Sequence, residues 1–134
     1  MDVDAKAPVR RIVQAEPVSV DERMTLNSLA AVLAARGIGV ALVRRADGGL
    51  GIVSERDVTR ALADAADPDA VWAADVMTED LVTVDADDRV VDAALRLIDE
   101  DIRHAVVVDG DEVLGVVSAR DLFRIVTEEL LDSW

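Results

Sequence analysis

A seven-residue phrase that occurs twice constrains the fold of this chain more than any other feature. It consists of Gly, two β-branched residues, Ser, any residue, Arg and Asp, and it spans residues 51–57 and 115–121. An apolar β-branched run followed by Ser, with Asp three residues later, is typical of a buried strand that ends where a capped helix begins. Backbone N–H groups at a helix start also attract anions. The Ser and Asp therefore have two open explanations: they cap their helix, or they bind an anionic ligand together with the Arg.

The repeat extends far beyond this phrase. Residues 17–57 align with residues 81–121 without a gap, at an offset of 64 residues. A long unit present only twice is not a solenoid, which needs several short repeats. We therefore predict two copies of one small α/β unit, packed on each other about a pseudo-twofold axis.

Hydrophobic patterning predicts the order β-α-β-β-α within each copy. In the first copy we expect strands at 18–20, 38–43 and 50–53 and helices at 26–36 and from 54 to about 65. In the second we expect strands at 81–84, 105–108 and 114–117 and a final helix over 118–131. The expected apolar faces of the first helix in each copy are Leu26, Leu29, Ala30 and Leu33, and Val90, Ala93, Ala94, Leu97 and Ile98.

This pattern predicts an α/β fold of the α+β sandwich type, with helices on one side of a small sheet. The repeats are expected at residues 10–66 and 74–131, joined by a linker at 67–73, and residues 1–9 are expected to be loose. Because only three of the 134 residues are aromatic, the core must consist of Val, Leu, Ile and Ala.

Composition excludes several classes of function. The chain has no cysteine, which excludes disulfides and thiolate sites. Its net charge of −14 argues against binding to nucleic acid. It has no apolar run of membrane-spanning length and no signal region, so we expect a cytoplasmic protein without membrane contact.

The repeated phrase resembles that of the tandem cystathionine-β-synthase (CBS) domain pair, also called a Bateman module. The runs Asp75–Thr78 and Ile102–Asp109 match the same family, and the resemblance covers the chain from about Arg11 to Thr127. Since nothing is left over for a catalytic domain, the chain is similar to stand-alone CBS-pair proteins. The resemblance implies a regulatory module that senses adenosyl ligands (AMP, ADP, ATP or S-adenosylmethionine) in clefts between the repeats. It implies no required cofactor and no metal.

The same resemblance implies roles for individual residues. Asp57 and Asp121 would accept hydrogen bonds from ribose hydroxyls, Ser54 and Ser118 would contact ribose or phosphate, and the phosphate would lie near Arg56 and Arg120. The wall beside the base would consist of Ile12, Val13, Val76 and Met77. Each cleft would borrow a further wall from the other repeat. For Asp57 this wall would be Thr83, Ile102, Arg103 and His104, and for Asp121 it would be Ser19, Ile38, Gly39 and Val40.

The two clefts are therefore expected to differ. Arg103 and His104 occupy the positions that Gly39 and Val40 occupy in the first copy, so the Asp57 cleft is predicted to bind the nucleotide more tightly. The alternative is that Arg103 and His104 are an exposed turn pair after a helix. Arg44 and Arg45, which have no counterpart in the second copy, are interpreted as surface residues.

Two functions from different classes remain open. One is a nucleotide sensor that passes its state to an unidentified partner protein; the other is a ligand-free dimerisation protein with vestigial pockets. An enzyme is not expected, because the chain has one His, no Cys and no nucleophile–base or metal-ligand cluster. Apolar helix faces that one small sheet cannot bury predict a homodimer.

Overall fold

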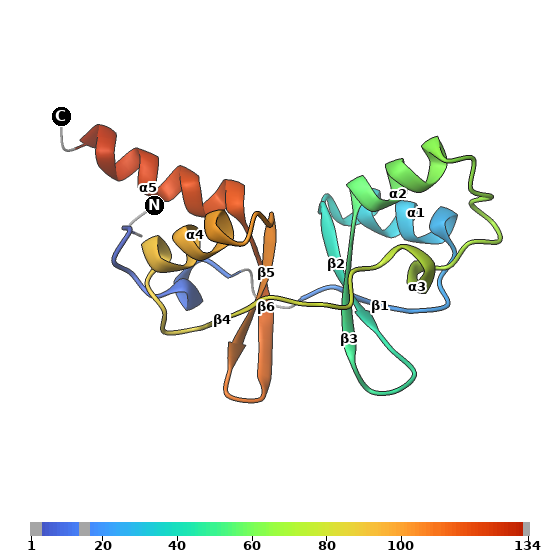
Figure 1. The fold of residues 1–134 in the computed structure, drawn as a ribbon, viewed down its shortest axis with the longest axis horizontal. Helices are drawn as coiled ribbons and strands as arrows, with labels where there is room; N and C mark the ends of the chain where they lie inside the picture. The colour runs from blue at the N-terminus through green and yellow to red at the C-terminus, as the bar shows by residue number, and fades with distance from the viewer. Residues whose placement is uncertain (1–3, 14–16, 133–134) are drawn as a thin grey trace. The chain divides into compact units, whose positions relative to one another are not determined.

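The structure is a computed structural model that describes residues 4–13 and 17–132. The chain forms two compact units (Figure 1). The N-repeat unit is Val18–Leu81, and the C-repeat unit combines Met1–Pro17 with Val82–Trp134. No helix within the described residues has the length and apolar character that crossing a membrane requires.

The N-repeat unit is a three-stranded sheet covered by helices. Its elements are β1 (Ser19–Asp21), α1 (Leu26–Arg36), β2 (Val40–Arg44), β3 (Leu50–Ser54), α2 (Glu55–Ala63) and the short α3 (Ala73–Val76). The middle strand β2 pairs in parallel with β1 and antiparallel with β3. Alternate strand residues pack against α1 and α2, so both helices cover the same face of the sheet.

The C-repeat unit has the same topology. Its elements are the 3-10 helix η1 (Val9–Arg11), β4 (Thr83–Asp85), α4 (Val90–Asp99), β5 (His104–Asp109), β6 (Glu112–Ser118) and α5 (Ala119–Asp132). Here β5 lies between a parallel β4 and an antiparallel β6. The mixed α+β class predicted from the sequence is confirmed, and so is the order β-α-β-β-α in each copy. The short helices η1 and α3 were not predicted.

Each unit has an aliphatic core, as the composition required. The N-repeat core contains Val20, Leu26, Leu29, Leu33, Ala41, Val43, Val53, Val58 and Ala73. The C-repeat core contains Val9, Val84, Ala86, Val90, Ala93, Ala94, Leu97, Ala105, Val107, Val117, Leu122 and Ile125. Two predicted core positions are wrong, because Ala30 is exposed and Ile98 is 57% exposed. Both lie at the edge of an apolar stripe whose other members already cover the sheet.

The N-terminal segment completes the second copy rather than the first. The N–H groups of Val9 and Arg10 donate to the carbonyls of Asp88 and Ala86, at 2.8 and 2.9 Å. The carbonyl of Ala7 accepts from the N–H of Val90, at 2.9 Å. That N–H stands at the start of α4, where no earlier turn supplies a carbonyl. Residues 1–9 were expected to be loose; for residues 4–9 this is wrong, since Val9 is fully buried.

The segment before the second copy completes the N-repeat unit in the same way. The N–H groups of Ala73 and Ala74 donate to the carbonyls of Met24 and Glu22, at 2.7 and 2.9 Å. At the start of α1, the N–H of Leu26 donates to the carbonyl of Val71, at 3.0 Å. Each repeat is thus completed by the segment that precedes the other one. The repeat boundaries expected from the sequence remain a prediction.

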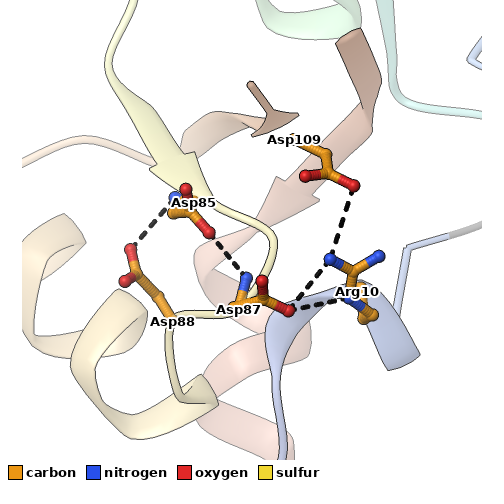
Figure 2. A network of polar contacts seen from close by, with 5 residues as sticks. All are labelled: Arg10, Asp85, Asp87, Asp88 and Asp109. Carbon is orange, nitrogen blue, oxygen red and sulfur yellow. Dashed lines mark hydrogen bonds and ion pairs between the residues drawn. The ribbon is translucent and has the colours of Figure 1, made fainter. Parts of the chain in front are cut away.

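An ionic network fastens the N-terminal segment to the C-repeat unit (Figure 2). Arg10 donates to Asp87 at 2.9 Å and to Asp109 at 3.5 Å. Asp85 and Asp88 hold the same turn, because the N–H of Asp87 donates to Asp85 and the N–H of Asp85 donates to Asp88. The hydrogen bond to Asp87 is the main reason why the pKa of Arg10 is raised. All of these side chains are substantially exposed, so the network orients the segment more than it stabilises the fold.

Candidate functional site

The corner between β3 and α2 is organised by Ser54 and Asp57. The hydroxyl of Ser54 accepts from the N–H of Asp57 at 3.2 Å. Asp57 Oδ2 accepts from the N–H and the hydroxyl of Ser54, at 2.8 and 3.0 Å. This is a capping box, so the structural explanation offered for this pair is confirmed. Within the described part of the chain Asp57 Oδ1 accepts no hydrogen bond, which leaves one carboxylate oxygen available to a ligand.

The corner between β6 and α5 is similar but looser. The hydroxyl of Ser118 accepts from the N–H of Asp121 at 3.1 Å. Among residues 4–13 and 17–132, no group donates to the carboxylate of Asp121, which is exposed. Arg56 and Arg120 are exposed beside the two corners, and neither forms an ion pair with a described residue.

Strand register places a second pair of residues beside each corner. In the N-repeat unit Val40 pairs with Ser54, and the carbonyl of Gly39 accepts from the N–H of Glu55 at 2.9 Å. In the C-repeat unit His104 pairs with Ser118, and the carbonyl of Arg103 accepts from the N–H of Ala119 at 2.7 Å. These two backbone contacts are equivalent in the two units, whereas the side chains at these positions differ.

An apolar wall lies against the N-repeat corner. Thr78 pairs with Ile52 through two backbone hydrogen bonds of 2.8 and 2.9 Å, which adds the segment after α3 to the edge of β3. Gly51 permits this approach, because a Cβ there would lie 2.6 Å from Met77 Sδ. Met77 is partly buried against the N-repeat core, and the equivalent Val13 packs in the same way on the C-repeat core.

The remaining predicted site residues lie near the other strand ends. Ile38 and Ile102 are partly buried against the cores of their own units. The hydroxyl of Ser19 accepts from Arg44 Nη1 at 2.6 Å, and the carbonyl of Thr83 accepts from Arg96 Nη1. Arg44 is exposed as predicted. Arg45, by contrast, is only 28% exposed and forms ion pairs with Asp47 and Glu79, a role that its sequence did not reveal.

The structure therefore groups the predicted residues by unit. The N-repeat unit holds Ser19, Ile38, Val40, Ser54, Arg56, Asp57 and Met77. The C-repeat unit holds Val13, Thr83, Ile102, Arg103, His104, Ser118, Arg120 and Asp121. The expectation that Asp57 shares a ligand with Arg103 and His104 joins two units and stays a prediction.

Neither corner resembles a metal or acid–base centre. The described residues contain no group of His, Cys, Asp and Glu side chains that could hold a metal ion. An ion pair at the start of α4 lies outside both corners, and there the hydrogen bond from Arg89 lowers the pKa of Asp92. What the corners offer is carboxylate and hydroxyl oxygens beside arginine, a set suited to a hydroxylated anionic ligand.

Comparison with known families decides what kind of fold carries these corners. A family model described as the CBS domain matches the chain twice, over residues 9–64 and 73–128. The chain belongs to the CBS domain family. The resemblance inferred from the repeated phrase is thus confirmed, and both corners lie inside matched CBS domains.

Solved structures of other CBS domain proteins share this fold. The CBS domain protein PAE2072 from Pyrobaculum aerophilum, solved in complex with AMP, is 34% identical with a TM-score of 0.78. That similarity covers 93% of this chain and 98% of the other. The CBS domain pair of protein MJ0100, solved with 5′-methylthioadenosine and S-adenosyl-L-methionine, is 24% identical with a TM-score of 0.75. The similarity covers 88% of this chain and 94% of the MJ0100 chain. At 24% identity it supports the fold alone.

Curated relatives of this CBS domain protein are longer than the chain itself. The uncharacterized protein MK0525 from Methanopyrus kandleri is 28% identical over 120 residues, which is 87% of this chain and 61% of the relative. The uncharacterized protein MJ1225 from Methanocaldococcus jannaschii is 24% identical over 119 residues, which is 88% of this chain and 42% of the relative. The chain thus spans less than two thirds of either protein.

Proposed function

We propose that this CBS domain pair is a regulatory module that binds an adenosine nucleotide. The observation that carries the proposal is the strand-to-helix corner present in both repeats. At each corner a Ser caps the helix, and the Asp three residues later has a carboxylate oxygen that accepts no hydrogen bond from a described residue. The AMP complex of the relative that is 34% identical supports an adenosine ligand.

The proposed roles follow from the chemistry of each group. An ionised carboxylate can accept hydrogen bonds from the two vicinal hydroxyls of a ribose, which suits Asp57 Oδ1 and the exposed carboxylate of Asp121. An arginine can donate two hydrogen bonds to one phosphate, which suits Arg56 and Arg120. The partly buried Met77 offers an apolar surface to the base beside the N-repeat corner.

Arg103 and His104 distinguish the two sites in this proposal. We assign them to the nucleotide that Asp57 binds, as the family resemblance implies, whereas their counterparts Gly39 and Val40 add no charge to the other site. Phosphate binding is therefore stronger at the site of Asp57. The competing assignment gives both residues to the ligand of Asp121, because His104 pairs with Ser118 at that corner. The double-mutant cycle described below distinguishes the two assignments.

Calorimetry with AMP tests the ribose contact. Asp57→Ala is expected to weaken binding by about 1.5–3 kcal/mol, the usual range for hydrogen bonds to a charged group. Because Asp57 also caps α2, Asp57→Asn is the cleaner variant: it keeps an acceptor but removes the charge. Wild-type affinity in both variants would contradict the proposed contact.

A double-mutant cycle tests the assignment of Arg103. If Arg103 and Asp57 bind one nucleotide, the losses caused by Arg103→Ala and Asp57→Asn will not be additive. Arg120→Ala is the matched control, since Arg120 lies on the helix of the other corner, and its loss should add to that of Asp57→Asn. Additive losses for Arg103 would show that it serves a different ligand.

The regulatory part of the proposal concerns assembly. A nucleotide can act as a signal only if it binds two arrangements of the protein with different affinity. We propose that these arrangements belong to a homodimer that acts on a partner protein and catalyses no reaction. The competing function, a ligand-free dimerisation protein, predicts no heat of binding with AMP, ADP, ATP or S-adenosylmethionine.

A further inference from the structure

The end of the middle strand carries opposite charges in the two repeats. Arg45 directly follows β2, and Asp109, the residue 64 positions later, ends β5. Arg45 Nη2 lies 3.5 Å from Glu79 Oε1. Asp109 Oδ2 lies 3.5 Å from Arg10 Nη2, the contact drawn in Figure 2. Equivalent positions thus form ion pairs of reversed polarity, and each partner belongs to the segment that completes the unit.

Each ion pair lies close in the chain to a residue proposed as the wall of a nucleotide site. Met77 lies two residues before Glu79, and Val13 lies three residues after Arg10. Both apolar side chains are partly buried against the core of their own unit. Each ion pair therefore joins the segment of one wall residue to the hairpin of the same unit.

In the N-repeat unit the ion pair complements a backbone contact. Two hydrogen bonds between Thr78 and Ile52 attach the residue after Met77 to β3. The side chain of Arg45 is 28% exposed, the lowest fraction among the arginines that form ion pairs within the described residues. Partly buried charges are screened less by salt than exposed ones, so Arg45 can attract Glu79 across 3.5 Å.

The polarity indicates that these charges are matched to the segments. Arg45 also pairs with Asp47 in its own hairpin, at 2.9 Å. The equivalent pair cannot form in the C-repeat unit, because Asp109 and Asp111 are both acidic. The ion pair that both repeats share is therefore the one to the segment. If each segment docked on the other unit, like charges would meet, which is unfavourable.

We propose that Arg45 and Asp109 are positioning residues, which raise the affinity of the two nucleotide sites by holding Met77 and Val13 in place. They act without touching the nucleotide. A wall that is already fixed in the free protein loses less conformational freedom when the ligand binds, and such preorganisation raises affinity. This inference rests on the proposed function, since it requires the wall residues to contact an adenosine ligand.

Calorimetry with AMP tests the positioning role through the sign of the effect. Glu79→Gln removes a negative charge, so long-range electrostatics alone would strengthen the binding of anionic AMP. Loss of positioning instead weakens it, and we expect a loss of roughly two- to fivefold, the range of exposed ion pairs. Asp80→Asn is the matched control. It removes the same charge one residue later, from an exposed side chain without an ion pair to a described residue, and should not weaken binding.

The C-repeat unit offers the same comparison. Asp109→Asn should weaken AMP binding and Asp111→Asn should not, although both remove one negative charge from an exposed side chain. A double variant tests the ion pair itself. Arg45→Gln combined with Glu79→Gln should bind AMP no more weakly than Arg45→Gln alone, because both changes break one contact.

Amide hydrogen exchange without nucleotide gives a readout that does not depend on binding. The N–H groups of Thr78 and Ile52 should exchange faster in Glu79→Gln than in Asp80→Asn, because the segment is held less firmly. If the wild type binds no adenosine ligand, the proposed function and this inference fail together. If the wild type binds AMP but Glu79→Gln leaves either the affinity or the exchange unchanged, the positioning role is overturned and the proposed function stands.

Discussion

At the scale of single residues, Gly51 positions the wall beside the proposed nucleotide site. A Cβ at this position would lie 2.6 Å from Met77 Sδ and 3.2 Å from the carbonyl oxygen of Thr78. The Met77 side chain can turn away, but the Thr78 carbonyl is held because it accepts from the N–H of Ile52. A residue larger than glycine would therefore separate the segment of Met77 from β3.

We predict that Gly51→Ala lowers the free energy of unfolding by about 1–3 kcal/mol, the usual cost of overpacking. Gly39→Ala is the matched control, because its Cβ would meet only the Glu55 side chain, at 3.8 Å. Its effect should stay within about 0.5 kcal/mol. Urea unfolding measures both, and equal stability of the two variants would show that the Gly51 contact is unimportant.

Residue patterns predicted the two strand-to-helix corners better than they predicted which residues at the border of the core are buried. Ser and Asp three residues apart after an apolar run are a sufficient signal for a capping box, and Ser54 and Asp57 form one. The exposure of Ile98 could not be predicted in this way. Helical periodicity places Ile98 beside Leu97 and Ala94 on one stripe, but how far a sheet extends beneath that stripe is a tertiary property.

At the scale of elements, the exchanged segments are the main feature that the sequence did not reveal. The segment before each repeat completes the other repeat, so its partner is distant in the sequence. Ala5, Ala7 and Val9 are buried while Lys6 is exposed, so buried and exposed side chains alternate along a segment that forms a turn over residues 4–7 and a 3-10 helix from Val9. That alternation was the available signal. It indicates burial without naming the surface that provides it.

We predict that Val9→Ala destabilises the protein by about 1–3 kcal/mol, because Val9 is fully buried in the C-repeat core. Lys6→Ala on the exposed side of the same segment is the control and should change stability by less than about 0.5 kcal/mol. Chemical denaturation measures both changes. If Val9→Ala unfolds like the wild type, the segment does not dock on this unit in solution.

At the scale of the whole molecule, net charge limits which nucleotide can bind. The net charge of −14 on the chain repels any anionic ligand that approaches it. Salt screens charges beyond about 8 Å at physiological ionic strength, so the groups near the ligand decide the balance. In the proposed site of Asp57 these are Arg56, Arg103 and His104, a small number of cations for a polyphosphate.

We therefore predict that AMP or ADP binds more tightly than metal-free ATP. Magnesium should narrow the difference, since it neutralises part of the additional charge on ATP. Calorimetry with the three nucleotides, with and without magnesium, measures this order. Tighter binding of metal-free ATP would mean that the site contains cations other than these three.

The measurement that tests the central proposal most directly is a thermal-shift titration with AMP, ADP, ATP, S-adenosylmethionine and GMP. A ligand that binds only the folded protein stabilises it by about 2.7 kcal/mol when its concentration is about 100 times Kd. We predict that AMP raises Tm by several degrees in a saturable manner and that GMP does not. If no adenosine ligand raises Tm at millimolar concentration, the nucleotide-sensing function is contradicted and the ligand-free dimerisation protein becomes the better description.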